Sequence, residues 1–265
     1  MMADSRFLQA LKHRVILGSG AMGTEFLRRS RESGHPLDEL NLTRPHLVLG
    51  LTKEYVEAGA ELVKTNTFLA NRLRLAKAGL EDKVGEIDLA GARLAREAAP
   101  NGFVAGAVGP LSDVHASTIE KSEAFLEQCR SLAAGGCDVL LLESFRRKED
   151  LQLAVTAARE TGLPVISQMA ALEEKDLDGL VAADVVGVNC ISGDQAVAAV
   201  KRLSGMSYRP RSAWPGGGLP GKEVLPGAFA EGIRALVAAG VRVVGGCCGA
   251  GPEHIRAAAL LGGVR

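Results

Sequence analysis

The most informative stretch of the chain lies near its end and reads VRVVGGCCG, residues Val241–Gly249. The β-branched run at its start predicts a strand, and the glycines that follow predict a tight turn where the strand ends. Side chains alternate between the two faces of a strand, so the thiols of Cys247 and Cys248 can face one point only where the backbone bends. A third cysteine, Cys190, follows another such run, Val185–Asn189. We therefore predict that the three thiols converge on one metal ion.

Outward from this stretch, short apolar runs alternate with longer amphipathic runs along the whole chain. The runs that predict strands are Val15–Leu17, Leu62–Thr65, Phe103–Val108, Val139–Glu143, Val165–Gln168, Val185–Asn189, Arg211–Trp214 and Val241–Gly245. The runs that predict helices are Arg44–Gly59, Val84–Ala98, Ser122–Ala134, Lys148–Thr161, Asp194–Leu203 and Ala228–Ala239.

Strict alternation of eight strands with helices predicts an α/β fold, a single (β/α)8 TIM barrel that forms one domain over residues 1–265. A doubly wound open sheet is the alternative. The segment Ala170–Ala183 leaves room only for a short helix, so we expect the barrel to be irregular between residues 165 and 190.

The charge balance of the chain narrows the classes of partner. Lys and Arg together number 31, as do Asp and Glu, so the formal net charge is zero and no basic stripe favours nucleic acid. The N-terminus lacks a signal-peptide core, no run is long enough to cross a membrane, and five cysteines fit poorly with a disulfide framework. We expect a cytoplasmic protein that acts on small molecules, and a homo-oligomer is compatible with the sequence.

Small and polar residues gather where the predicted strands end, which is where a barrel of this kind builds its active site. They are Gly18–Thr24, Thr65–Thr67, Gly109–Ser112, Glu143-Ser144, Asn189-Cys190, Gly216–Gly218 and Cys247-Cys248. The first of these loops lacks both the dinucleotide and the phosphate-loop patterns, so we exclude a nucleotide site there.

Three thiolates suit Zn²⁺ and leave one position of a tetrahedral shell open. The alternative interpretation makes Cys190 a core residue and leaves Cys247 and Cys248 as free thiols or a vicinal disulfide. Cys129, in a helical pattern, and Cys137, just before a strand, are expected to be ordinary buried thiols.

Two kinds of polar residue at the strand ends have alternative interpretations. Glu143 closes an apolar run, where a carboxylate needs a partner, either a substrate ammonium or a basic residue of the barrel. Asn66 and Asn189 could orient a substrate or tie loops together. His254 is expected on a helix surface.

Several stretches together carry a resemblance to a known family. They are Gly20–Thr24, Asn41–Pro45, Thr65–Phe68, Gly109–Leu111, Leu141–Glu143, Gly187–Cys190, Gly218–Pro220 and Gly245–Gly249, in an order that runs through nearly the whole chain. In these the chain resembles the homocysteine S-methyltransferases, the family of the homocysteine-binding barrel of cobalamin-dependent methionine synthase and of the betaine– and S-methylmethionine–homocysteine methyltransferases.

The resemblance implies a zinc-bearing barrel with Cys190, Cys247 and Cys248 as ligands. It implies that Glu143 holds the amino group of the substrate and that backbone amides around Gly20 and Ala21 receive its carboxylate. The other candidates for substrate binding are Ser19, Thr65, Asn66 and Asn189. Ser19 departs from the family, which usually has Asp there.

The predicted reaction is zinc-dependent transfer of a methyl group to the thiol of homocysteine, which gives methionine. Zinc would hold the thiol as thiolate, so no catalytic residue beyond the metal ligands is expected. The methyl donor is open, and a cobalamin or folate donor would come from a separate protein or by diffusion. The alternatives are a methyltransferase for a different small thiol, a zinc hydrolase, and a zinc- and thiol-binding barrel without turnover.

Overall fold

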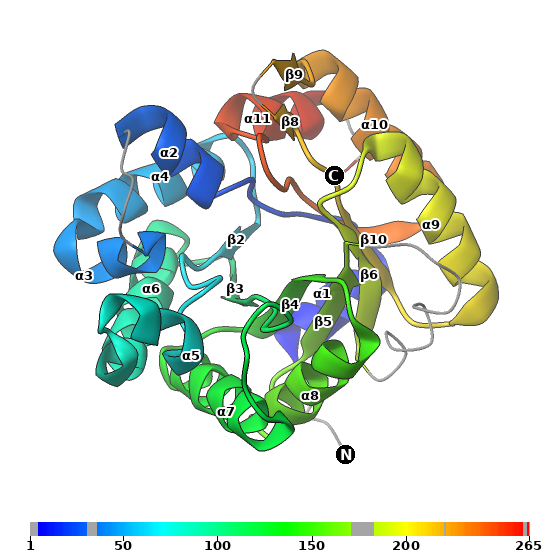
Figure 1. The fold of residues 1–265 in the computed structure, drawn as a ribbon. Helices are drawn as coiled ribbons and strands as arrows, with labels where there is room; N and C mark the ends of the chain where they lie inside the picture. The colour runs from blue at the N-terminus through cyan, green and yellow to red at the C-terminus, as the bar shows by residue number, and fades with distance from the viewer. Residues whose placement is uncertain (1–4, 31–35, 171–182, 220, 262–263, 265) are drawn as a thin grey trace.

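Eight parallel strands form one sheet that closes into a barrel in the computed structural model, which describes residues 5–30, 36–170, 183–219, 221–261 and 264 (Figure 1). The strands are β1 (Ile16–Leu17), β2 (Leu62–Lys64), β3 (Phe103–Val108), β4 (Val139–Phe145), β5 (Val165–Met169), β6 (Val185–Asn189), β7 (Arg211–Trp214) and β10 (Val241–Val244). Each predicted strand is present, with ends that differ by at most two residues.

The barrel closes between its first two strands. The sheet order is β1-β10-β7-β6-β5-β4-β3-β2, and a parallel bridge between Gly18 and Leu62 joins the two edge strands. Ser19 N–H donates to the Leu62 carbonyl at 2.8 Å, and Glu61 N–H donates to the Leu17 carbonyl at 2.8 Å. The predicted TIM barrel is therefore confirmed, and the open doubly wound sheet is excluded.

Helices surround the sheet, as Figure 1 shows in a view along the barrel. They are α4 (Pro45–Glu57), α6 (Val84–Ala98), α7 (Thr118–Ala134), α8 (Lys148–Arg159), α9 (Gly193–Met206), α10 (Pro226–Ala238) and α11 (Pro252–Leu261). The predicted helix at Ser122 begins earlier, because Ser117 and Glu120 form a capping box that starts α7 at Thr118. The predicted irregularity at Ala170–Ala183 lies almost wholly outside the described residues, which omit 171–182.

Shorter elements lie in the loops that link the strands to their helices. They are α2 (Gly23–Ser30), η1 (Leu37–Glu39), α3 (Leu40–Thr43), α5 (Arg72–Leu75), η2 (Ala76–Ala78), η3 (Glu81–Lys83) and the hairpin of β8 (Gly218–Leu219) with β9 (Lys222–Glu223). Of these elements, α2 and η1 contribute residues to the pocket described below.

The barrel interior holds a core of its own, closed at one end by helix α1 (Arg6–His13). Phe7 and Leu11 of α1 pack with inward-facing strand residues, and Phe7 meets Phe103 edge-on at 5.5 Å between ring centroids. Trp214 is fully buried in the same core, and a Cβ atom on Gly18 or Gly245 would collide with its ring. Small residues at these two positions therefore let the tryptophan fill the barrel.

His254 differs from the prediction of a surface histidine. It is 6% exposed, its Nδ1 accepts the Gly251 N–H at 3.2 Å, and its Nε2 lies 2.7 Å from the Val224 carbonyl. The ring packs edge-on against Phe229, so the side chain joins the start of α11 to α10. The helical pattern alone did not show that a second helix covers this position.

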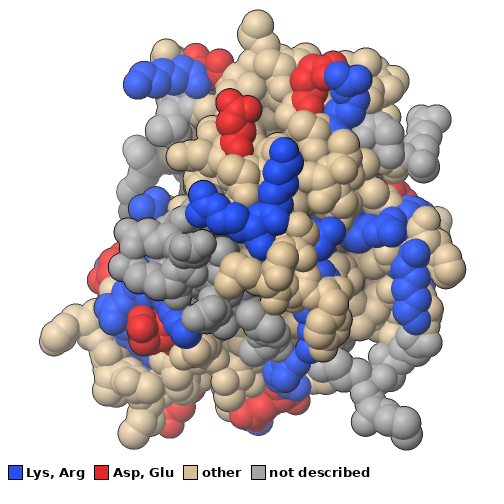
Figure 2. Space-filling model, turned by 90° about the vertical axis from the view of Figure 1, so that its right-hand side faces the viewer, with Lys and Arg blue, Asp and Glu red and all other residues tan. Residues whose placement is uncertain are grey.

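Both signs of charge occur on the face in Figure 2, interspersed with uncharged residues, in keeping with equal numbers of acidic and basic residues. Among the described residues, no helix is both long enough and apolar enough to span a membrane.

Candidate active site

Three cysteines meet at the ends of β6 and β10. Their sulfur atoms all lie within 4.8 Å of one another, and the sulfurs of Cys190 and Cys248 are 3.6 Å apart. All five cysteines of the chain are free thiols, and Cys129 and Cys137 are buried in the core as expected. The convergence of Cys190, Cys247 and Cys248 is as predicted.

The loop after β7 holds these cysteines in place through the backbone. Cys190 N–H donates to the Trp214 carbonyl at 3.0 Å, and Cys247 N–H donates to the Pro215 carbonyl at 2.9 Å. The Cys248 carbonyl accepts the Gly217 N–H at 2.8 Å. These hydrogen bonds join the ends of β6, β7 and β10 around the thiols. The local sequence of one strand cannot specify how the three ends are aligned.

The spacing of the thiols fits a tetrahedral metal ion. Zinc bonds to sulfur at about 2.3 Å, so two ligands of a tetrahedral site lie about 3.8 Å apart. The separation of 3.6 Å between Cys190 and Cys248 and the limit of 4.8 Å for the set agree with this geometry. A group of three soft donors suits Zn²⁺ better than Mg²⁺ or Ca²⁺, which prefer oxygen.

The thiols share their protons unequally. Contact with the other two thiols, Cys190 above all, lowers the pKa of Cys248, whereas contact with Cys247 and Cys248 raises the pKa of Cys190. The direction at Cys248 favours the thiolate, which is the form of cysteine that binds a metal ion.

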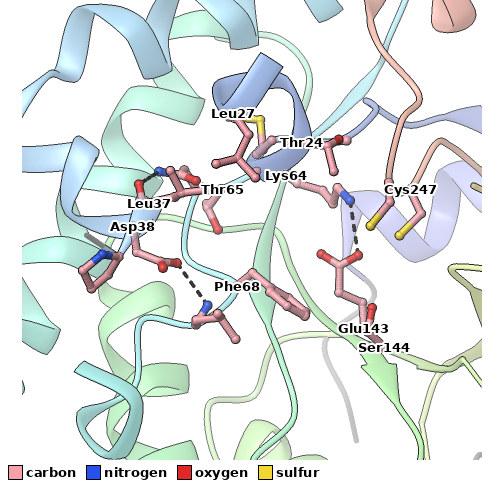
Figure 3. A pocket seen from close by; sticks show the side chains of 17 residues that line it. Thr24, Leu27, Leu37, Asp38, Lys64, Thr65, Phe68, Glu143, Ser144 and Cys247 are labelled. Atoms are coloured by element: carbon pink, nitrogen blue, oxygen red, sulfur yellow. Dashed lines mark hydrogen bonds and ion pairs between the residues drawn. The ribbon is translucent and has the colours of Figure 1, made fainter. Parts of the chain in front are cut away.

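A pocket of about 410 Å³ opens beside Cys247 and Cys248 (Figure 3). Its lining is Ala21, Met22, Gly23, Thr24, Leu27, Pro36, Leu37, Asp38, Lys64, Thr65, Asn66, Phe68, Leu69, Glu143, Ser144, Cys247 and Cys248. Of the predicted substrate residues, Ala21, Thr65, Asn66 and Glu143 are in this lining, and Ser19, Gly20 and Asn189 are not.

Glu143 forms the ion pair that was the alternative to a substrate contact. Lys64, at the end of β2, places its Nζ 3.2 Å from Glu143 Oε2, and each side chain is 6% exposed. Burial raises the pKa of Glu143 and the lysine charge opposes that rise. Burial lowers the pKa of Lys64, but the charges of Glu143 and Cys247 outweigh burial and the net direction is upward.

Lys64 was missed by the analysis of the sequence, although it carries the same signal as Glu143. It follows the apolar run Leu62-Val63, at the end of a strand where the active site is built. Its Nζ lies 4.8 Å from the centre of the Trp214 ring, which the ammonium faces.

The two asparagines tie loops together. Asn66 donates to the Leu37 carbonyl at 2.7 Å and to Asn41 Oδ1 at 3.2 Å. Asn189 accepts the Ser144 N–H at 2.8 Å and donates to Ser144 Oγ at 2.8 Å, and its Nδ2 lies 3.7 Å from the Cys247 sulfur. Thr65 accepts the Ala107 N–H at 2.9 Å.

The loop after β1 is held by hydrogen bonds to neighbouring parts of the barrel. Ser19 is 1% exposed and its Oγ accepts the backbone N–H of Lys64 at 3.1 Å. The Ala21 N–H, expected to receive a substrate carboxylate, donates to the Ala250 carbonyl at 3.0 Å. The amides that open helix α2, at Gly23 and Thr24, come next along the pocket wall and have no acceptor within their own helix.

Comparison with known proteins agrees with the barrel fold. A model of the homocysteine S-methyltransferase family matches residues 16–260, and the chain belongs to that family. It is similar to the methionine synthases of Mycobacterium leprae and Mycobacterium tuberculosis, each 29% identical over 96% of this chain. The chain spans about a quarter of the length of these relatives, 25% in each case.

The fold also matches solved structures of a homocysteine methyltransferase, MmuM from Escherichia coli. The metallated form superposes with a TM-score of 0.81 at 24% identity, covering 96% of this chain and 98% of that one. The oxidized form gives a TM-score of 0.81 at 23% identity, covering 94% and 97%.

Proposed function

We propose that the chain is a zinc-dependent S-methyltransferase that moves a methyl group to the thiol of a small acceptor. Homocysteine, with methionine as product, is the acceptor that the family name supports. The observation that carries the proposal is the set of three cysteine sulfurs within 4.8 Å of one another, two of them in the wall of a pocket of about 410 Å³.

Cys190, Cys247 and Cys248 would hold the ion. Zinc bound there would keep the thiol of the acceptor as thiolate near neutral pH, where a free thiol of pKa about 8.5 is mostly protonated. The thiol proton leaves to solvent, a sulfur–methyl bond forms and the bond from methyl to donor breaks. No general base is assigned.

The pocket positions the acceptor. The first turn of α2 offers the amides of Gly23 and Thr24 to the carboxylate, since the start of a helix favours an anion. Met22, Leu37 and Phe68 line the pocket and would enclose the aliphatic part of the acceptor. Positioning of the sulfur in line with the methyl group would supply most of the rate acceleration.

We also propose that residues 1–265 form one domain and that the protein acts in the cytoplasm. A cobalamin or folate methyl donor would come with a separate protein.

The zinc hydrolase is the weaker alternative, because three thiolates donate much charge to the ion and make it a poor acid for a bound water. In this proposal, the loops around the acceptor are shaped by Ser19, Gly20, Thr65, Asn66 and Asn189.

The test is a panel of methyl donors offered to the zinc-loaded protein with homocysteine, and the methylated product is measured by mass spectrometry. The donors are methylcobalamin, methyltetrahydrofolate, S-methylmethionine and S-adenosylmethionine. We expect methionine from at least one of them and none from the Cys248→Ala variant. Binding of zinc and thiol without product from any donor would instead identify a binding barrel without turnover.

A further inference from the structure

The chain places an ammonium group of its own in the acceptor pocket. Lys64 Nζ lies 3.2 Å from Glu143 Oε2, both side chains are almost wholly buried, and both line the pocket next to Cys247. Figure 3 shows the pair close to the cysteine sulfurs. An acceptor whose thiol bound at these cysteines would therefore lie beside this pair.

A carboxylate that anchors a substrate ammonium must be available for it. Here Glu143 is already neutralised by Lys64, and a second ammonium on the same carboxylate would lie beside the lysine charge. Like charges that share one buried site destabilise each other strongly, because little water is present to screen them. The pair thus disfavours an amino group at this position of the acceptor.

The other acid in the pocket lies elsewhere. Asp38 lines the wall formed by η1, where its Oδ1 accepts the Leu69 N–H at 3.0 Å. Figure 3 shows it on the side of the pocket opposite Cys247. An ammonium held by Asp38 would be separated from the thiols by the width of the pocket, so Asp38 does not replace Glu143.

Ser19 does not restore a negative charge near the pair. Its hydroxyl is turned to the backbone N–H of Lys64 and is buried in the seam between β1 and β2. Among the described residues that line the pocket, the charged side chains apart from the thiols are Asp38, Lys64 and Glu143. The ion pair beside the thiols therefore carries no net charge of its own.

Resting on the proposed function, we propose that the preferred acceptor is a small thiol that ends in a carboxylate and carries no ammonium group. Lys64 stands in the place of that ammonium and acts as the residue that determines specificity. The chemistry of the acceptor is that of a mercaptoalkanoate, and homocysteine is the poorer acceptor.

The test uses two thiols that differ only in the ammonium group, homocysteine and 4-mercaptobutanoate. Each is titrated into the zinc-loaded protein by calorimetry, a readout that needs no methyl donor. We expect 4-mercaptobutanoate to bind at least tenfold more tightly. In the Lys64→Met variant, which frees Glu143, the ratio should shift by at least tenfold in favour of homocysteine.

A matched control is available in a second buried ion pair. Lys121 Nζ lies 3.4 Å from Asp150 Oδ1, outside the pocket, with side chains 11% and 5% exposed. Lys121→Met removes a buried lysine of the same kind and should leave the ratio of the two affinities unchanged.

The outcomes separate this inference from the proposed function. Homocysteine binding as tightly as 4-mercaptobutanoate to the wild-type protein would overturn the inference alone, and that comparison needs no variant to fold. An unchanged ratio in a folded Lys64→Met protein would overturn it as well. Failure of both thiols to bind would overturn the proposed function, and the inference with it.

Discussion

At the scale of single residues, the rim of the barrel holds two side chains on unusual backbone. Ser144 and Cys190 have positive φ values of 66° and 59°, a conformation that non-glycine residues rarely adopt and that costs about 1–3 kcal/mol each. Both hydrogen bonds between Asn189 and Ser144 link these positions, across the ends of β4 and β6. The backbone bend at Cys190 turns its sulfur toward Cys248, so the strain serves the cluster.

The cluster leads to a prediction for metal content. We expect about one zinc per chain in the wild-type protein and its loss in Cys248→Ala, because two thiolates and water hold the ion far more weakly than three thiolates. Atomic absorption after dialysis against a weak chelator measures it.

The control for this experiment is another cysteine of the same chain. Cys129 of α7 is fully buried and is not one of the three converging thiols, so Cys129→Ala should keep its zinc even though it loses some stability. Full zinc occupancy in Cys248→Ala would show that the thiols do not form the site.

At the scale of elements, the short helix η1 carries a buried acid into the pocket wall. Asp38 is 4% exposed and accepts the Leu69 N–H at 3.0 Å, which fastens η1 to the loop after β2. Burial raises the pKa of Asp38 to about 6, against the hydrogen bonds that favour its charged form. The element is therefore held in place by a carboxyl that is costly to ionise.

This shift predicts how stability depends on pH. Because the folded pKa of about 6 is above that of the unfolded chain, the contribution of Asp38 is fully present below about pH 4 and is lost as pH rises through 6. Asp38→Asn cannot ionise and can still accept the Leu69 N–H. We expect it to be more stable than wild type at pH 8 by about 1–3 kcal/mol and nearly equal at pH 4.

Urea unfolding at the two pH values measures the effect. Asp82→Asn, at an exposed site on η3, serves as control and should show no such pH-dependent difference. A gain of equal size at pH 4 and pH 8 would contradict the assignment to ionisation of Asp38.

At the scale of the whole molecule, the site stands on a barrel whose interior is packed from the opposite end. Helix α1 inserts Phe7 and Leu11 into the core that also holds Trp214, and Trp214 lies directly under Lys64 at the rim. The stability of the barrel therefore depends on the packing of α1 at one end of this core, whereas the position of the site depends on the opposite end.

Removal of one side chain from α1 tests this separation. Phe7→Ala should lower the free energy of unfolding by about 3–5 kcal/mol, as large-to-small changes in a core do, and leave the zinc content of the folded protein unchanged. Chemical denaturation and metal analysis measure the two effects.

Leu8→Ala is the matched control, since Leu8 is only partly buried on the same helix. It should cost clearly less than Phe7→Ala. Equal losses in the two variants would mean that α1 does not close the barrel core.

Local pattern alone was enough for the eight strands of the barrel, for six of the helices around it and for the position of the thiols in the sequence, but it did not show helix α1. A run such as Val185–Asn189 is buried on both faces of a parallel strand, so it is apolar up to its last residue, and its end is marked by a change to small or polar residues. One such strand end is followed by Cys190, and another is followed by Cys247 and Cys248. Each of these signals is contained within a few neighbouring residues, so the sequence alone is enough to detect it.

The partners of the polar side chains were decided by tertiary structure. Lys64 and Glu143 are separated by 79 positions and meet only because β2 and β4 lie on either side of β3 in the closed sheet. Ser19 turns to the seam between β1 and β2, and His254 is covered by Phe229 of α10. Which side chains share a buried space depends on strand order, register and closure of the barrel, and these are properties of the whole packed chain that no local stretch encodes.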